Sequence, residues 1–338
     1  AFGYIIGRIL SSYFLIPMYY DSNVISIYQI IGEKFGDMVQ RLSSIIFLIT
    51  RVLADGVRFL LTAIVIREII GIPLEFCIII IGVATLIYSV LGGVKTIITI
   101  DSLQFFVYVF GGLAVVFYIF TCCGEVLNIN LDHFFNRPIF KTYVGSSEQI
   151  LSTFSFNSTI LFDPNFFLNA IIGGIFLSFC SHGVDHMMVQ RVLCTPNLKS
   201  AQKAMIGSGF LVFLQFFLFI FIGFLLNEYY AHPIPGFLEK DTEFAHFITH
   251  ELPVGLKGML IVGVLSAAMS TLSSSINSLS SSAIIDFKLK YNNHLKLYVG
   301  IFWSIILMLI ASFFDKSNEA LIITGIKIAS YTYGILLS

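Results

Sequence analysis

Long apolar segments alternate with polar joints along the whole of this 338-residue chain. Nine such segments cover approximately residues 1–20, 38–66, 72–91, 98–121, 166–190, 204–227, 255–284, 296–314 and 319–337. Each is close to the roughly 20 residues that an α-helix needs to cross the hydrocarbon core of a bilayer. The pattern therefore predicts an all-α, polytopic membrane protein. Because the first and last residues fall inside apolar segments, we expect the chain to be a piece of a longer protein.

Two of the joints are long, at residues 122–165 and 228–254, and we expect extramembrane hairpins or short interfacial helices there. Lys and Arg predict the orientation, because loops on the cytoplasmic side carry an excess of them. If the first segment runs inward, the inner loops hold nine of these residues and the outer loops six. We therefore predict that both long loops lie outside the cell.

One apolar segment differs from the others because it is rich in hydroxyl groups. Residues 263–282 read Gly-Val-Leu-Ser-Ala-Ala-Met-Ser-Thr-Leu-Ser-Ser-Ser-Ile-Asn-Ser-Leu-Ser-Ser-Ser. One helical face of this segment carries mostly small, oxygen-bearing residues, namely Ala267, Ser270, Thr271, Ser274 and Ser278. Such a face suits either close packing against neighbouring helices or the binding of a cation by oxygen ligands.

Composition supports the membrane class and removes several others. The mean hydropathy is +0.90, with 57% hydrophobic and only 12% charged residues, which is too apolar for a soluble domain. The net charge of −1, without a basic cluster, argues against nucleic acid as a partner. The five cysteines lack paired spacing, so neither a disulfide framework nor a zinc site is predicted.

Charged residues inside the second segment form a pattern of their own. Arg51, Asp55 and Arg58 recur at intervals of four and three residues, so one helical face can hold an Arg–Asp–Arg cluster. Buried charges within a span are costly unless they are paired or reach a cavity. The cluster is therefore either a structural ion pair or a place where Arg58 receives an anionic substrate group.

Further polar residues lie in two other segments. Asp101 either caps the start of the fourth helix or offers a cation a hard, negative ligand. His182, Asp185 and His186 stand close together on the fifth segment. Two histidines four residues apart resemble a metalloprotease helix, but Gly183 occupies the place of the required Glu. We therefore expect no transition metal, and a role for this group in lining or gating a pore.

Four stretches together resemble the sodium:solute symporter family. They are Tyr88-Ser-Val-Leu-Gly-Gly-Val-Lys-Thr-Ile-Ile-Thr-Ile-Asp-Ser-Leu-Gln104, then His186-Met-Met-Val-Gln-Arg191 with Lys199-Ser-Ala-Gln-Lys203, then Gly32-Glu-Lys-Phe-Gly36, and the Ser-rich segment. The first and last are specific, whereas the Gly-Glu-Lys-Phe-Gly match alone is weak.

The resemblance implies the five-plus-five inverted-repeat fold of the leucine-transporter type, with ions and substrate bound near the membrane midplane. The first segment then corresponds to the second core helix, so the first core helix is expected to be absent. Residues 1–338 would form a single transporter domain. Residues 1–121 would be the first repeat without its first helix, 122–165 an extracellular loop, and 166–338 the second repeat.

The resemblance also assigns site residues. The family's main sodium site takes a backbone carbonyl and two hydroxyls from the Ser-rich helix, which correspond to Ala267, Ser270 and Thr271. Members with a second sodium ion add hydroxyls one turn further in and the Asp of the Thr-x-Asp motif. These correspond to Ser273, Ser274 and Asp101, and one carboxylate would neutralise the ion in a low-dielectric site.

Substrate contacts of the family fall on Ser178, Ser181 and His182. Sugar carriers place an amide and aromatic gate residues there, and this chain does not. Small polar groups near the Arg58 cluster favour a small organic anion instead. The resemblance thus implies a multi-pass plasma-membrane carrier, not an enzyme, whose ligands are sodium and an organic solute and which needs no other cofactor.

Two other classes of function stay open from the sequence. A transporter-like membrane unit can serve as the sensor of a signalling protein, a difference that sequence beyond Ser338 would reveal. A membrane-embedded hydrolase would need a metal cluster or a base–nucleophile pair, and His182 and His186 alone support it poorly.

Overall fold

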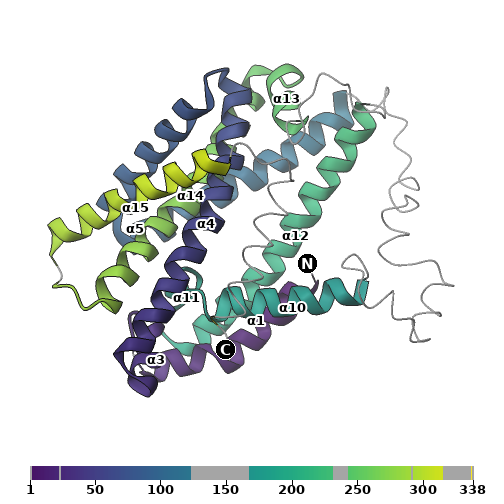
Figure 1. Ribbon diagram of the computed structural model, residues 1–338. Coiled ribbons are helices and arrows are strands. Elements are labelled where there is room, and N and C mark those ends of the chain that lie inside the picture. Colours follow the sequence, from purple (N-terminus) through teal and green to yellow (C-terminus); the bar gives the residue numbers. More distant parts are fainter. Residues whose placement is uncertain are drawn as a thin grey trace.

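The computed structural model describes residues 2–22, 24–122, 167–230, 243–290 and 292–314, together with Leu336. All regular structure in these residues is helical (Figure 1). The helices are α1 (Phe2–Phe14), α2 (Ile16–Ser22), α3 (Tyr28–Phe35), α4 (Asp37–Ile70), α5 (Leu74–Cys122), α10 (Phe167–Gly183), α11 (His186–Leu193), α12 (Leu198–Tyr229), α13 (Glu243–His250), α14 (Val254–Asp286) and α15 (Asn293–Phe314). The predicted loop at 122–165 falls, but for Cys122, outside the described residues, as does nearly all of the ninth segment.

Several of these helices are long and apolar enough to cross a membrane. Four described helices pass by themselves, and up to six spans result if each of two bent pairs counts as one. One pair is α10 with α11, bent by 62°, and the other joins α4 to the first part of α5, bent by 114°. The all-α membrane class is thereby confirmed. Two predicted segments, 72–91 and 98–121, are continuous in helix α5.

The helices form two groups, which meet where α12 packs against α5 and where α11 packs against α14 (Figure 1). Helix α14 packs against α5, α4, α15 and α11, whereas α1 packs chiefly against α10 and α12. The contact between α1 and α10 is unusually close, because a Cβ on Gly3 would collide with the backbone carbonyl of Ile171. Small residues permit this approach in membrane helices, where packing rather than hydrophobic burial holds the helices together.

Apolar residues are distributed as expected for a protein in lipid. One buried cluster joins α4, α14 and their neighbours, and a second joins α5, α12 and α13. Large apolar side chains also remain exposed on outward faces, among them Phe106, Phe110 and Phe117 of α5 and Phe216 and Phe217 of α12. Exposed aromatic residues in such numbers suit contact with lipid rather than water.

Polar contacts join helix ends at two opposite ends of the bundle. Lys288, just after α14, forms an ion pair of 2.5 Å with Asp37 at the start of α4. At the opposite end, Tyr118 of α5 and Tyr229 of α12 both donate to Glu251, at 3.0 and 2.6 Å. The segments predicted to share the inner side, and those predicted to share the outer side, therefore lie together.

Candidate functional site

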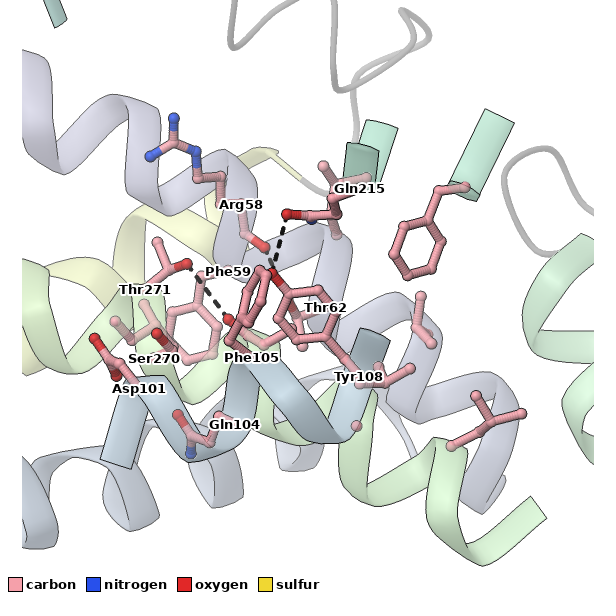
Figure 2. A pocket seen from close by; sticks show the side chains of 18 of the residues that line it. Arg58, Phe59, Thr62, Asp101, Gln104, Phe105, Tyr108, Gln215, Ser270 and Thr271 are labelled. Carbon is pink, nitrogen blue, oxygen red and sulfur yellow. Dashed lines mark hydrogen bonds between the residues drawn. The ribbon is translucent and has the colours of Figure 1, made fainter. Parts of the chain in front are cut away.

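A cavity of about 640 Å³ lies between α4, α5, α12 and α14 (Figure 2). Most of its wall is apolar. The polar or charged lining residues are Arg58, Thr62, Asp101, Gln104, Tyr108, Arg191, Gln215, Ser270 and Thr271. The three residues predicted for the main sodium site, Ala267, Ser270 and Thr271, all line this cavity. A concave, mostly apolar space with a few converging polar groups is typical of a small-molecule site.

One face of α14 carries oxygen atoms and lines the cavity, and helical spacing explains why these residues share that face. Ser270 and Thr271 follow Ala267 by three and four residues, so both lie on the same side of the helix as Ala267. The Thr271 hydroxyl donates a long hydrogen bond of 3.4 Å to the Ala267 carbonyl, drawn dashed in Figure 2. Two hydroxyls and a carbonyl are thus gathered at the cavity wall.

Asp101 and Ser274, predicted for a second sodium site, come together in the structure. The Ser274 hydroxyl donates to Asp101 Oδ2 at 3.3 Å. Arg191 Nη2 reaches the same carboxylate oxygen at 2.8 Å and also donates to Ser274. Ser273 is different, because its buried hydroxyl donates to the Ser270 carbonyl at 3.1 Å. Asp101 lies well inside helix α5, so the alternative that it caps a helix start is wrong.

The predicted Arg–Asp–Arg cluster of α4 is confirmed and has a fourth member. Arg51 binds both oxygens of Asp55, at 2.6 and 2.8 Å, and Arg58 binds Asp55 at 2.9 Å. Arg51 also reaches Asp185 at 2.8 Å, and the Ser275 hydroxyl donates to Asp55. Asp185 occupies the break between α10 and α11 and caps α11 by accepting from the Met187 amide.

The two arginines of this cluster differ in their exposure and in whether they can bind a ligand. Arg51 is only 1% exposed and lies between two carboxylates, so it is a structural ion pair. Arg58 is 49% exposed and shares Asp55 with Arg51. An arginine has five N–H donors, so Arg58 keeps donors for an anion in the cavity.

The predicted substrate contacts on α10 do not line the cavity. Ser178 donates to the Tyr4 carbonyl of α1 at 2.8 Å. The Ser181 hydroxyl and His182 Nδ1 lie 2.8 Å apart, and His182 Nδ1 also lies 3.2 Å from the Ser178 carbonyl. All three side chains are buried. The described part of the chain holds no group of three or more His, Cys, Asp or Glu residues arranged to bind a metal ion.

A row of polar contacts joins α11 to α14. His186 and Gln190 both reach the Ser281 hydroxyl, at 3.1 and 3.2 Å, and Asn277 donates to Gln190 at 3.2 Å. Sequence reasoning missed Gln190 and also missed Gln104 of the cavity wall. The available signal was that each is an uncharged polar residue within or next to an apolar run.

Bent helix pairs beside a mostly apolar cavity with a few converging polar groups are typical of the class of secondary transporters. Within that class, the chain belongs to the sodium:solute symporter family, whose model matches residues 1–330. The structure has the fold of a Na⁺-coupled sialic acid symporter solved in a substrate-bound outward-open state. The TM-score is 0.76 at 22% identity, covering 99% of this chain and 72% of that one.

Curated relatives agree with this membership. The chain is 25% identical over 294 residues to a putative sodium-dependent multivitamin transporter of Drosophila melanogaster, covering 84% of this chain and 46% of the relative. It is 26% identical over 281 residues to the sodium/sialic acid symporter of Proteus mirabilis (strain HI4320), covering 80% and 52%. The chain thus spans about half the length of the curated relatives it matches.

Proposed function

We propose that the protein is a sodium-coupled symporter that carries a small organic solute across the cell membrane. The observation that carries the proposal is that the oxygen face of α14 opens into the same cavity as Arg58. An ion and a solute bound there would share one space. Family membership supports the same activity, because the relatives named above are sodium-coupled carriers.

Three residues would hold the first sodium ion. The Ala267 carbonyl and the Ser270 and Thr271 hydroxyls are hard oxygen ligands, which suit a hard monovalent cation. Sodium binding would stabilise the arrangement in which the solute site is formed. Coupling then follows from the higher affinity of sodium for that arrangement, which shifts the population toward it.

A second sodium ion would bind at Asp101 with Ser273 and Ser274. The contact between Ser274 and Asp101 supports this grouping. Asp101 would supply a charged oxygen ligand, whose charge the ion would share with Arg191. If the site operates, Asp101→Asn should lower the Hill coefficient for sodium toward one. A coefficient that stays near two in a working carrier would refute the assignment.

The solute would be a small organic anion bound through Arg58. This residue combines a half-exposed guanidinium with a place in the cavity wall, and a guanidinium binds a carboxylate through two parallel hydrogen bonds. Ser178, Ser181 and His182 would then act at a gate between α10 and α1 rather than as direct ligands, because their hydrogen bonds join these helices or remain within α10.

Uptake measurements on the full-length protein test the proposal. Sugars, monocarboxylates and amino acids are offered with and without a sodium gradient, and uptake of one class should require sodium. The double variant Ser270→Ala with Thr271→Ala should then abolish sodium-dependent uptake. Ser312→Ala is the matched control, because Ser312 is an exposed position on α15 whose hydroxyl donates to the Met308 carbonyl of its own helix. Sodium dependence that survives the double variant would exclude the first site.

A further inference from the structure

Two buried acceptor atoms without hydrogen bonds lie next to one another on helix α5. They are Asp101 Oδ1 and Gln104 Oε1, and they are two of six buried side-chain nitrogen or oxygen atoms without a hydrogen bond among the described residues. The residues are three positions apart, so their side chains leave the same face of the helix. Both residues line the 640 Å³ cavity. In Figure 2 the amide oxygen of Gln104 lies on the side of its side chain toward Asp101.

The other oxygen of Asp101 is already engaged. Oδ2 accepts from Arg191 at 2.8 Å and from Ser274 at 3.3 Å, which fixes the carboxylate and leaves Oδ1 buried without a hydrogen bond. Ser270 of α14 lies beside the same carboxylate. Three kinds of oxygen, from a carboxylate, an amide and a hydroxyl, are thus gathered where α5 faces α14.

We propose that Gln104 is a ligand of the second sodium ion, which binds between Gln104 Oε1 and Asp101 Oδ1 beside Ser270. This inference rests on the proposed sodium-coupled function and places the ion at Asp101 Oδ1, on the helix face shared with Gln104, rather than beside Ser273 and Ser274. Neither atom can donate a hydrogen bond, because a carboxylate and an amide oxygen are acceptors only. A cation satisfies both at once, and buried acceptors of this kind are otherwise rare.

Charge favours a monovalent ion at this position. Arg191 offsets the charge of Asp101 through its ion pair, so the pair together is close to neutral. A divalent ion would place two positive charges beside a guanidinium in a space of low dielectric, where repulsion is strong. A single charge is tolerated more easily, and an anionic solute bound at Arg58 in the same cavity would balance it.

The test compares two glutamines of the same cavity in the purified full-length protein. The Oε1 atom of Gln215 already accepts from Tyr108 at 3.1 Å, whereas that of Gln104 has no partner. Sodium-induced thermal stabilisation is titrated with NaCl, without solute, against choline chloride. Gln104→Leu should raise the NaCl concentration that gives half-maximal stabilisation about tenfold. This is the loss expected when a charged ion loses one of its ligands. Gln215→Leu should change it less than twofold.

The alternative explanations give different outcomes. If Gln104 merely supports Asp101 by turning its amide to donate, Gln104→Leu leaves sodium affinity unchanged or increases it, and the inference is overturned. The two oxygen atoms could instead accept a hydrogen bond from the solute. Gln104→Leu would then change the solute concentration that gives half-maximal uptake but not the solute-free sodium titration, and this result also overturns the inference. Gln104→Glu provides a second measurement, because an added anionic oxygen should lower the sodium midpoint severalfold.

Failure of the inference and failure of the proposed function are distinguishable. Without any sodium-dependent uptake or sodium stabilisation in the unmodified protein, the proposed function itself is lost. With sodium-driven uptake intact and all Gln104 variants matching the Gln215→Leu control, only the placement of the second ion is wrong. Asp101→Asn, measured alongside, reports whether that ion uses Asp101 at all.

Discussion

The two halves of helix α14 are joined to the rest of the protein in different ways. Beyond Ser274, toward Asp286, hydroxyls, amides and carboxylates connect α14 to α11, α4 and the residues before α3. The space left between α5, α11 and α14 there is only about 10 Å³. Before Ser274, one face of α14 lines the 640 Å³ cavity and makes few polar contacts with other helices. The half of α14 beyond Ser274 is thus packed closely against its neighbours, and we call it the closed half. The half before Ser274 lines the cavity, and we call it the open half.

The difference indicates how such a helix can serve alternating access. A half held by many short polar contacts is closed, but each contact exchanges readily for water when the helices separate. A half lined by apolar residues and a few oxygens stays available to ions and solute. The positive-inside prediction places the closed half toward the cytoplasm and the half that lines the cavity toward the outside.

The largest effect is expected from breaking the buried ion cluster that joins α4 to the break between α10 and α11. Arg51→Met leaves Asp55 and Asp185 buried without their main partner, which should cost about 3–5 kcal/mol of stability. Arg58→Met, which removes a half-exposed partner of the same Asp55, should cost about 1 kcal/mol or less. Thermal unfolding in detergent micelles measures both, and equal losses would show that burial does not set the difference.

A smaller loss should follow from removing the carboxylate at the closed end of α14. Asp286 accepts from Ser26 at 3.0 Å, Gln40 at 3.0 Å and Ser282 at 2.6 Å. Asp286→Ala removes the acceptor of three buried donors and should lower the free energy of unfolding by about 2–3 kcal/mol. Ser282→Ala removes one donor and should cost about 1 kcal/mol. If the two variants unfold at the same temperature, Asp286 does not organise this end.

Much of the architecture could be predicted from the sequence because its signals are local. Runs of apolar residues indicated the spans, and the spacing of Arg51, Asp55 and Arg58 indicated their cluster. The break between α10 and α11 was not evident, since no proline marks it and Asp185 reads as one more residue of an apolar segment. Its role as a cap and as a partner of Arg51 depends on α4 lying alongside, which no local pattern encodes.

In the candidate site, too, positions on one helix could be predicted from the sequence, whereas contacts between distant residues could not. Ala267, Ser270 and Thr271 share a face through helical spacing, so their joint position in the cavity wall could be anticipated. The contact of Arg191 with Asp101 joins residues 90 positions apart and could not be. The satisfied amide of Gln215 and the unsatisfied oxygen of Gln104 look alike in sequence, because hydrogen-bond partners are a property of the packed helices.

Packing on the open half can be tested by adding bulk to α14. A Cβ on Gly263 would lie 3.3 Å from the Tyr108 Cα of α5, whereas one on Gly258 would meet nothing within 4 Å. Gly263→Val should therefore push the two helices apart, cost about 1–2 kcal/mol and lower maximal uptake. Gly258→Val introduces the same β-branched residue on the same helix without that clash. Indistinguishable stability of the two variants would argue against a close contact between α5 and α14.

The smallest effect is expected beyond the closed end of α14, at Lys288. Its ion pair with Asp37 joins side chains that are 56% and 58% exposed, so Lys288→Ala should cost less than about 0.5 kcal/mol. Lys288 also has a φ of 55°, a left-handed conformation that glycine adopts without strain. Lys288→Gly should then be more stable than Lys288→Ala by about 1 kcal/mol, because both lack the ion pair and only glycine relieves the backbone. The reverse order in thermal unfolding would mean that the left-handed backbone at Lys288 carries no strain. A loss for Lys288→Ala well above about 0.5 kcal/mol would mean that the closed half depends on this surface pair.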